Sequence, residues 1–397
     1  MDTPHDREMN EEIKEALQNN NQALAIEKIQ ERLDKENNTP LKIAITGESG
    51  SGKSTFVNAF RGIDNSAEGA APTGATETTS VVTPYPHPKY PNVTLWDLPG
   101  VGTTKFPADQ YLKHVGFEKF DFFIIISATR FTENDVKLAQ EIQRMKKKFY
   151  FVRSKIDSDL YNERRSKREF SETRTKERIK DNCIQGLQEQ GIQSPQVFLV
   201  SSFELRLHDF SLLTETLERE LPEHKRNALL FAMPNISQQI INKKKEAFQA
   251  KIKWYASLSA VGAAVPVPGL SIAVDAPLLA GVVTQYVFGF GLDRPSLKRL
   301  AEITGVPFDD LMTVIISPLA ARKITADLII KVLSQCASTA ALLAAEEGAR
   351  FIPIIGIPVA MGLSFTATYS TLNFILTKLA DDAQRVFEKA LQRNTTD

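Results

Sequence analysis

One short run of residues has the composition of a phosphate-binding loop. Residues 47–54 read GESGSGKS and match the pattern GxxxxGK[ST] at every fixed position. Small residues let the backbone wrap a phosphate with its N–H groups, and the positive end of a following helix adds to the attraction. We expect Lys53 to bridge β- and γ-phosphate oxygens and Ser54 to bind Mg²⁺. The predicted nucleotide contacts of this run are Gly47, Glu48, Ser49, Gly50, Ser51, Gly52, Lys53, Ser54 and Thr55.

Two further motifs follow in the chain. Residues 97–100 read DLPG, so that Asp97 can hold Mg²⁺ through water and the Gly100 N–H can sense a γ-phosphate. Residues 153–157 read RSKID, in which the Asp157 carboxylate can accept hydrogen bonds from both N1–H and the 2-amino group of guanine. Adenine offers neither donor.

The other residues predicted to contact the base either precede Asp157 or follow the apolar run at residues 197–200. Ser154 precedes Lys155, which would lie along the base, and Ser201 and Ser202 would close over its O6. An SKxD run alone is common by chance. Its order after the other two motifs predicts a site for GTP and GDP, and leaves an ATPase as the alternative that competition of GDP against ADP would expose.

The elements that must position these motifs alternate in type. Short apolar runs at residues 41–46, 93–96, 122–127, 149–152 and 197–200 are separated by polar helical stretches such as residues 133–147. The phosphate loop stands between a strand and a helix. Such alternation predicts an α/β domain with a mixed, mostly parallel sheet and helices on both faces.

Helical patterns flank this domain on both sides. Residues 8–36 indicate an amphipathic helix, broken near residues 19–21, and after about Leu221 the strand signals fade. Asn235 or Ser237 could cap the first helix beyond that point. We therefore expect a helical segment at 1–38, the nucleotide-binding domain at 39–225 and a C-terminal helical domain at 226–397.

Composition restricts the class of partner and the compartment. Lysine plus arginine equals aspartate plus glutamate at 48 each in the 397 residues, which argues against a nucleic-acid partner. The charged residues 164–180 are typical of a solvated helix or loop, with a basic partner-binding face as the alternative. Cys183 and Cys336 form no disulfide or zinc pattern, which favours the cytoplasm. Asp2 stands where N-myristoylation needs glycine, and the charged N-terminus is unlike a secretion signal.

At this level of detail the chain resembles the immunity-related, or interferon-inducible, GTPases. The resemblance covers most of residues 40–225 and includes GAAPTGATETTS at 69–80, WDLPGVGT at 96–103, FDFFIIISATRFTEND at 120–135 and FYFVRSKIDSD at 149–159. Because the phosphate loop carries Lys53 and not methionine, the chain is similar to the GKS subgroup of effectors. The family implies a Ras-like P-loop GTPase domain, a helical domain from the N- and C-terminal segments, and regulatory GTPase relatives as possible partners.

Hydrolysis by a single copy should be slow. A Ras-like enzyme orients the attacking water with a glutamine directly after DxxG, and here that position is Val101. The family implies GTP-dependent dimerisation across the nucleotide face and a switch-region glutamate that matches Glu77; a solvated loop carboxylate is the alternative for this residue. Thr73, Thr76, Thr78 and Thr79 are candidates to bind Mg²⁺ or the γ-phosphate, and we expect Thr73 to be the metal ligand.

Two apolar stretches, residues 255–292 and 351–377, leave the membrane question open. They are long enough to span a bilayer but are interrupted by proline and glycine, so either buried core helices or a membrane-entering hairpin fits them. The family implies association with endoplasmic reticulum, Golgi or pathogen-vacuole membranes in cell-autonomous, interferon-induced defence. A regulatory nucleotide switch without that role is the alternative function.

Overall fold

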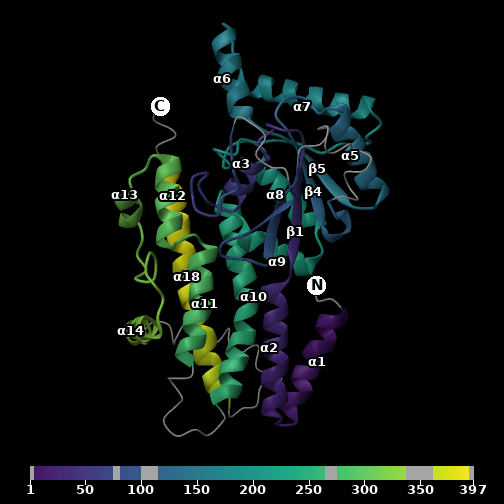
Figure 1. Cartoon of the computed structure of the whole chain (residues 1–397). Helices are drawn as coiled ribbons and strands as arrows, with labels where there is room; N and C mark the ends of the chain where they lie inside the picture. Colours follow the sequence, from purple (N-terminus) through teal and green to yellow (C-terminus); the bar gives the residue numbers. More distant parts are fainter. Residues whose placement is uncertain (1–3, 75–80, 100–114, 264–274, 337–360, 393–397) are drawn as a thin grey trace. The chain divides into compact units, whose positions relative to one another are not determined.

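The structure, a computed structural model, describes residues 4–74, 81–99, 115–263, 275–336 and 361–392. By its internal contacts the chain splits into two compact units. One unit is Pro40–Ile236, and the other combines Met1–Thr39 with Ser237–Asp397 (Figure 1). The helical unit is therefore assembled from both ends of the chain.

The unit Pro40–Ile236 is built on a six-stranded sheet with the order β2-β3-β1-β4-β5-β6. Among the described strand pairs, β2–β3 alone is antiparallel. The strands are β1 (Leu41–Thr46), β2 (Thr83–Pro86), β3 (Val93–Asp97), β4 (Phe122–Ser127), β5 (Lys148–Arg153) and β6 (Val197–Leu199). The predicted mixed, mostly parallel sheet is confirmed, and β2 is an addition to it.

Strand β2 was not predicted, and the reason is physical. Its sequence is TPYP, and proline has no N–H to donate to a neighbouring strand. Such a strand is tolerated only where one side needs no partner, and β2 does lie at the edge of the sheet, paired with β3 alone.

Helices cover both faces of this sheet. They are α3 (Lys53–Phe60), α5 (Glu133–Arg144), α6 (Ile156–Ser166), α7 (Glu172–Glu189), α8 (Phe210–Glu220) and α9 (Glu223–Ala232), with the short 3-10 helix η1 (Phe117–Lys119) before β4. On one face, Ala44, Phe123 and Ile125 pack into a core with Leu138 of α5 and Leu187 of α7. Alternate strand residues point the other way, where α3 and α8 meet through ring contacts of Phe56 and Phe60 with Phe210.

The expected domain boundary at residue 225 falls inside α9. That helix contacts β1 and β3, and the ring of its Phe231 stacks on Tyr90 at a centroid distance of 6.1 Å. These contacts attach α9 to the sheet unit, and the division between units comes after Ile236.

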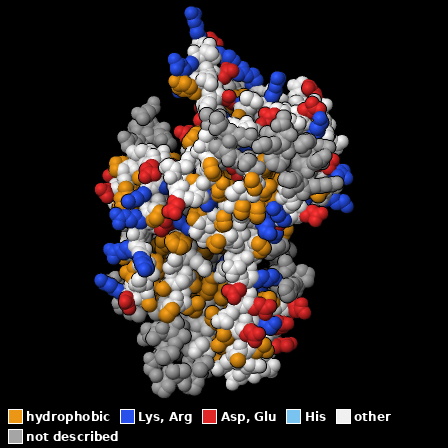
Figure 2. All heavy atoms as spheres, viewed as in Figure 1, with side chains coloured by type: hydrophobic (Ala, Val, Ile, Leu, Met, Phe, Trp, Pro, Cys, Tyr) orange, Lys and Arg blue, Asp and Glu red, His pale blue; other side chains and the backbone are white. Residues whose placement is uncertain are grey.

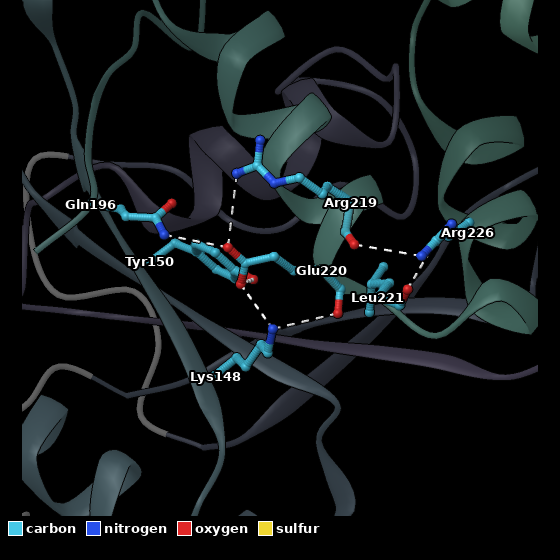
Figure 3. Close-up of polar contacts among 7 residues, drawn as sticks. All are labelled: Lys148, Tyr150, Gln196, Arg219, Glu220, Leu221 and Arg226. Atoms are coloured by element: carbon cyan, nitrogen blue, oxygen red, sulfur yellow. Dashed lines mark hydrogen bonds and ion pairs between the residues drawn. The ribbon is translucent and has the colours of Figure 1, made fainter. Parts of the chain in front are cut away.

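A polar cluster connects the N-terminal ends of β5 and β6 to the last turn of α8 (Figure 3). The Glu220 carboxylate accepts hydrogen bonds from Lys148 Nζ at 3.0 Å, the Tyr150 hydroxyl at 2.9 Å and Gln196 Nε2 at 3.3 Å. Burial opposes ionisation of Glu220, but these donors outweigh it and hold the pKa of the carboxyl below its ordinary value. The cluster thus depends on the charge of Glu220, and it lies at the N-terminal ends of the strands, opposite the phosphate loop.

The helical unit consists of α1 and α2 from the N-terminal segment and the helices after residue 237. Their bounds are α1 (Pro4–Gln18), α2 (Gln22–Asn38), α10 (Gln238–Ala263), α11 (Asp275–Gly289), α12 (Arg294–Thr304), α13 (Phe308–Thr313), α14 (Ala326–Cys336) and α18 (Gly362–Leu391). The predicted break near residues 19–21 is confirmed, and Ser237 Oγ accepts from Ile240 N at 3.2 Å as one of the two predicted caps.

Within this unit α10 packs along both α18 and α2. The described parts of the two apolar stretches include Ala256, Val283 and Phe365, which are all fully buried. Residues 264–274 and 351–360 of those stretches lie outside the described residues. In the part of the chain that the structure covers, no helix combines the length and the apolar character needed to cross a bilayer.

Candidate nucleotide-binding site

The phosphate loop connects β1 to α3 at the carboxyl edge of the sheet. Gly47, Gly50 and Gly52 have φ of +135°, +76° and +94°, a region that side-chain-bearing residues rarely adopt. At Gly47 a Cβ would lie 2.0 Å from the backbone oxygen of Ile126 in β4. Glycine is therefore needed at this position for two reasons, the backbone angle and the approach of β4.

The lysine of the loop is buried against the loop itself. Lys53 is the first residue of α3, and its Nζ donates to the Gly47 carbonyl at 3.1 Å and the Glu48 carbonyl at 2.7 Å. A buried ammonium held among backbone dipoles at a helix N-terminus suits the oxygens of a phosphate chain.

Two of the three residues predicted to bind Mg²⁺ are in contact. The Ser54 hydroxyl donates to Asp97 Oδ2 at 2.6 Å, and the Asp97 side chain is fully buried at the end of β3. Hydroxyl and carboxylate oxygens are the ligands that Mg²⁺ takes in proteins, usually completed by water and substrate phosphates. The donor set fits the ion that the motif predicts.

The segment predicted to bind guanine, residues 153–157, is bonded directly to the phosphate loop. Ser154 Oγ donates to the Ser51 carbonyl at 2.6 Å, and Lys155 Nζ donates to the Gly50 carbonyl at 2.9 Å. Lys155 itself adopts φ +55°, which turns the chain from β5 into α6. The segment predicted to bind the base and the loop predicted to bind the phosphates thus form one hydrogen-bonded unit.

Asp157 lies in the first turn of α6. Its Oδ1 is buried and makes no hydrogen bond to any of the residues that the structure describes. A buried carboxylate oxygen without a donor is costly, and a guanine base supplies donors of the right kind. Ser201, fully buried after β6, accepts from Phe203 N at 3.3 Å and lies in the loop of the neighbouring strand.

An ion pair beneath this segment was not predicted. Arg153 and Asp159 form a salt bridge, and Arg153 Nη1 also donates to the Ser154 carbonyl at 3.1 Å. Burial lowers the pKa of Arg153 and raises the pKa of Asp159, and each charge partly offsets the shift of the other. The pair fixes the turn that presents Lys155. Its signal was present in the sequence as an arginine before, and an aspartate two residues after, the SKxD run.

A second unpredicted carboxylate, Asp135, lies fully buried in the first turn of α5. It forms a capping box with Thr132, and burial raises its pKa to about 6. Hydrogen bonds with Thr132 oppose that shift, while the smaller effects of the Glu48 and Lys53 charges raise and lower the pKa respectively. The run TEND at 132–135 is a recognisable capping box and could have located it.

Several predicted site residues take no part in these contacts. Ser49 and Thr73 are exposed, while Thr55 and Ser202 are half-buried. The remaining predicted residues, Thr76, Glu77, Thr78, Thr79, Gly100 and Val101, lie outside the described residues.

The charged stretch at residues 164–180 belongs to α6 and α7. Figure 2 shows basic side chains at the end of the view where Figure 1 places α6, and Arg164, Arg165 and Arg168 are exposed. Glu163 pairs with both Lys167 and Arg178 at 2.7 and 2.8 Å, so part of this charge is neutralised locally.

Comparisons with known proteins agree with the geometry. The profile of the family described as "Interferon-inducible GTPase (IIGP)" matches residues 6–390. "Interferon-inducible GTPase 5" of Rattus norvegicus is 42% identical over 387 residues, covering 97% of this chain and 83% of that protein. "Interferon-gamma-inducible GTPase 10" of Mus musculus is 39% identical over 356 residues, covering 88% and 81%.

Among solved structures, an S. thermophilus NFeoB bound to GDP and AlF4⁻ aligns with TM-score 0.29 and 14% identity, over 69% of this chain and 92% of that one. Likeness at that level says nothing about function. The family match over nearly the whole length agrees with the contacts of the phosphate loop with residues 153–157 and of Ser54 with Asp97. The chain belongs to the interferon-inducible GTPase family and is a GTPase.

Proposed function

We propose that this chain binds GTP with Mg²⁺ at the carboxyl edge of its sheet and hydrolyses it rapidly only when two copies associate. The strongest support is the pair of bonds from Ser154 and Lys155 to carbonyls of the phosphate loop. Through them, recognition of the base at Asp157 and of the phosphates at Lys53 acts on one connected structure.

The residues divide the work by their chemistry. Lys53 binds β- and γ-phosphate oxygens, Asp157 accepts from the guanine, and Gly100 donates its N–H to the γ-phosphate. Ser54 and Thr73 would hold Mg²⁺ directly and Asp97 through water; when bound, the ion neutralises charge on the phosphates.

Self-association would supply what the single chain lacks. Val101 cannot polarise a water molecule, so Glu77 of the switch segment is proposed to take part in activation. Arg130 is an exposed cation in the loop after β4, held by a bond from Ser127 Oγ to its carbonyl at 3.0 Å. We propose that its charge acts on the nucleotide of a second copy, since an arginine stabilises charge on a transferring phosphoryl group.

The test measures turnover and sedimentation together across protein concentrations, with GDP and with a non-hydrolysable GTP analogue. Specific activity should rise with concentration, and association should need the analogue. Lys53→Ala should abolish tight nucleotide binding and, with it, both effects. A specific activity that stays constant over the range in which dimers form would remove the activation by a second copy.

We further propose a site of action at intracellular membranes, in interferon-induced defence. Endoplasmic reticulum, Golgi and vacuolar membranes are the candidate surfaces, reached by peripheral attachment or by a hairpin. Carbonate extraction distinguishes the two modes, since release into the soluble fraction argues against insertion. Failure of GTP to cause oligomers or to deform vesicles would favour a regulatory switch that binds partners, including GTPase relatives, instead.

A further inference from the structure

Helix α6 begins with two carboxylates whose surroundings differ. Asp157 and Asp159 both lie in its first turn. Asp159 forms a salt bridge with Arg153, whereas the buried Oδ1 of Asp157 makes no hydrogen bond within the part of the chain that the structure describes. The turn therefore presents one engaged and one unengaged carboxylate at the site predicted for guanine.

The guanidinium of Arg153 spans the turn that carries the predicted base contacts. Its Nη1 donates to the Ser154 carbonyl at 3.1 Å, and its Nη2 donates to Asp159 Oδ2, so the two bonds enclose the residues between them. Within that stretch Lys155 adopts φ +55°, an unfavourable backbone angle for a residue with a side chain. The planar fork of arginine suits two acceptors that lie in different parts of one turn. Arg153 thus stabilises a turn that the backbone alone disfavours.

Arg153 itself is held by the sheet. It is the last residue of β5, its backbone carbonyl accepts from Val200 N at 2.9 Å, and the next N–H, that of Ser154, donates to the Ser127 carbonyl of β4 at 2.8 Å. Its side chain is 8% exposed and lies near the buried Cys183 of α7. The start of α6 is therefore fixed to the sheet through this one side chain.

An unpaired Asp159 would interfere with Asp157. Burial raises the pKa of Asp159 most, the charge of Arg153 lowers it, and the charge of Asp157 raises it further, so the two carboxylates repel each other. Without its partner Asp159 would displace Asp157 by this repulsion or accept the donors of the base itself. The salt bridge removes both alternatives, because it neutralises Asp159 and occupies one of its oxygens.

We infer that Arg153 is a positioning residue that determines base specificity: it aligns Asp157 with guanine by holding Ser154 and Asp159 at the two ends of the turn. Guanine offers N1–H and a 2-amino group, and hypoxanthine offers N1–H alone. Because two donors at fixed spacing require a carboxylate at a fixed angle, loss of alignment weakens binding of guanine more than binding of hypoxanthine. The inference rests on the proposed binding of guanine by Asp157.

The chain contains a matched control in a second arginine with the same pattern of bonds. Arg385 pairs through Nη2 with Asp382 and donates from Nε to the Val314 carbonyl at 2.9 Å. These three residues belong to the helical unit, and all predicted nucleotide contacts belong to the sheet unit. Arg385→Met therefore removes the same chemistry from a unit that holds no part of the predicted site.

The experiment measures the dissociation constants of GDP and of inosine diphosphate, whose base is hypoxanthine, for the full-length chain with Mg²⁺. The unaltered chain should prefer GDP at least roughly ten-fold, as expected for one hydrogen bond to a charged group. Arg153→Met keeps the length of the side chain without its donors and should reduce this preference to less than about three-fold. Arg153→Lys keeps the charge without the fork and should lie between. Arg385→Met should leave the preference unchanged.

The ratio of the two dissociation constants separates positioning from a general effect on the fold, because a general effect weakens both nucleotides equally. An unchanged ratio in Arg153→Met, or a ratio that Arg385→Met lowers to the same extent, would overturn the inference. If Arg153→Met shows no cooperative thermal transition, the ratio measured for Arg153→Lys decides in the same way.

Asp157→Asn tests the proposed function on which the inference rests. If the unaltered chain does not prefer GDP, or if Asp157→Asn keeps the full preference, then Asp157 does not bind the 2-amino group, and the proposed base recognition fails together with the inference. A preference that is lost in Asp157→Asn but kept in Arg153→Met would remove the inference alone.

Discussion

Replacing Gly47 by alanine tests the packing of the phosphate loop, because two separate penalties fall on one methyl group. A φ of +135° costs a side-chain-bearing residue about 1–3 kcal/mol. The new Cβ would also lie 2.0 Å from the Ile126 oxygen, so β4 must shift by more than an ångström at a cost of about 1–3 kcal/mol. We expect a loss of about 4 kcal/mol in the free energy of unfolding.

Gly50→Ala is the control within the same loop. Its φ of +76° is equally unusual, but a Cβ there meets nothing within 4 Å. Only the left-handed backbone penalty of about 1–2 kcal/mol remains, and alanine offsets part of it by restricting the unfolded chain. We expect a loss of about 1 kcal/mol, which leaves a difference of about 3 kcal/mol between the variants.

Urea unfolding followed by tryptophan fluorescence measures this difference. The chain has two tryptophans, Trp96 in β3 and Trp254 in α10, so a Trp254→Phe background makes Trp96 the reporter of the sheet unit. By thermal unfolding the same losses correspond to roughly 8–16 °C against 2–4 °C for a unit of this size. If the free energies of unfolding of the two alanine variants differ by less than about 1 kcal/mol, the inference that β4 closely approaches Gly47 is wrong.

Three further predictions concern charge. Asp157→Asn should weaken GTP by about 2 kcal/mol but inosine triphosphate, which lacks the 2-amino group, by clearly less; equal losses in a nucleotide titration would contradict recognition of that group by Asp157. Glu220→Gln should lower the free energy of unfolding by about 1–2 kcal/mol at pH 7. Because the pKa of Glu220 is lowered in the folded state, its charge stabilises the fold above the ordinary pKa of 4.5, and this stabilisation is lost as pH falls through the pKa of the folded state. Thermal unfolding from pH 7 to 3.5 should therefore show the difference in stability between the two proteins shrinking. Burial lowers the pKa of Lys251 to about 8 from 10.5, so the unfolded chain binds more protons between these values and the helical unit should gain up to roughly 3 kcal/mol as pH rises across them. Lys251→Met should lack that rise in stability. If the melting temperatures of both proteins change equally between pH 7.5 and 10, the proposed effect of Lys251 is wrong.

The sequence predicted those parts of the fold that depend on local patterns. Five strands, the helix after the phosphate loop and the break near residue 20 follow from hydrophobic periodicity and from glycine, and the structure confirms them. The contact between Ser54 and Asp97 was predictable too, because residues at the carboxyl ends of adjacent parallel strands meet at one edge.

What the sequence could not reveal depends on partners distant in the chain. Helix α9 has the periodicity of the helices after it, and only its packing on β1 and β3 assigns it to the sheet unit. Asn58 and Arg61 occupy helix positions where polar residues are ordinary. Their side chains form hydrogen bonds with backbone carbonyl and N–H groups up to 25 residues away, which no local pattern encodes.

The construction of the helical unit from both ends of the chain has a consequence for biosynthesis. Helix α2 ends at Asn38 and its partner α10 begins at Gln238, so about 200 residues are translated between them. Helix α1 can pack on α2 at once, but at typical rates of about 5–20 residues per second the face of α2 that packs on α10 waits about 10–40 s for that partner. The sheet unit can complete its fold during this delay. A nascent chain of this protein therefore exposes one apolar face of an amphipathic helix early and completes its helical unit last.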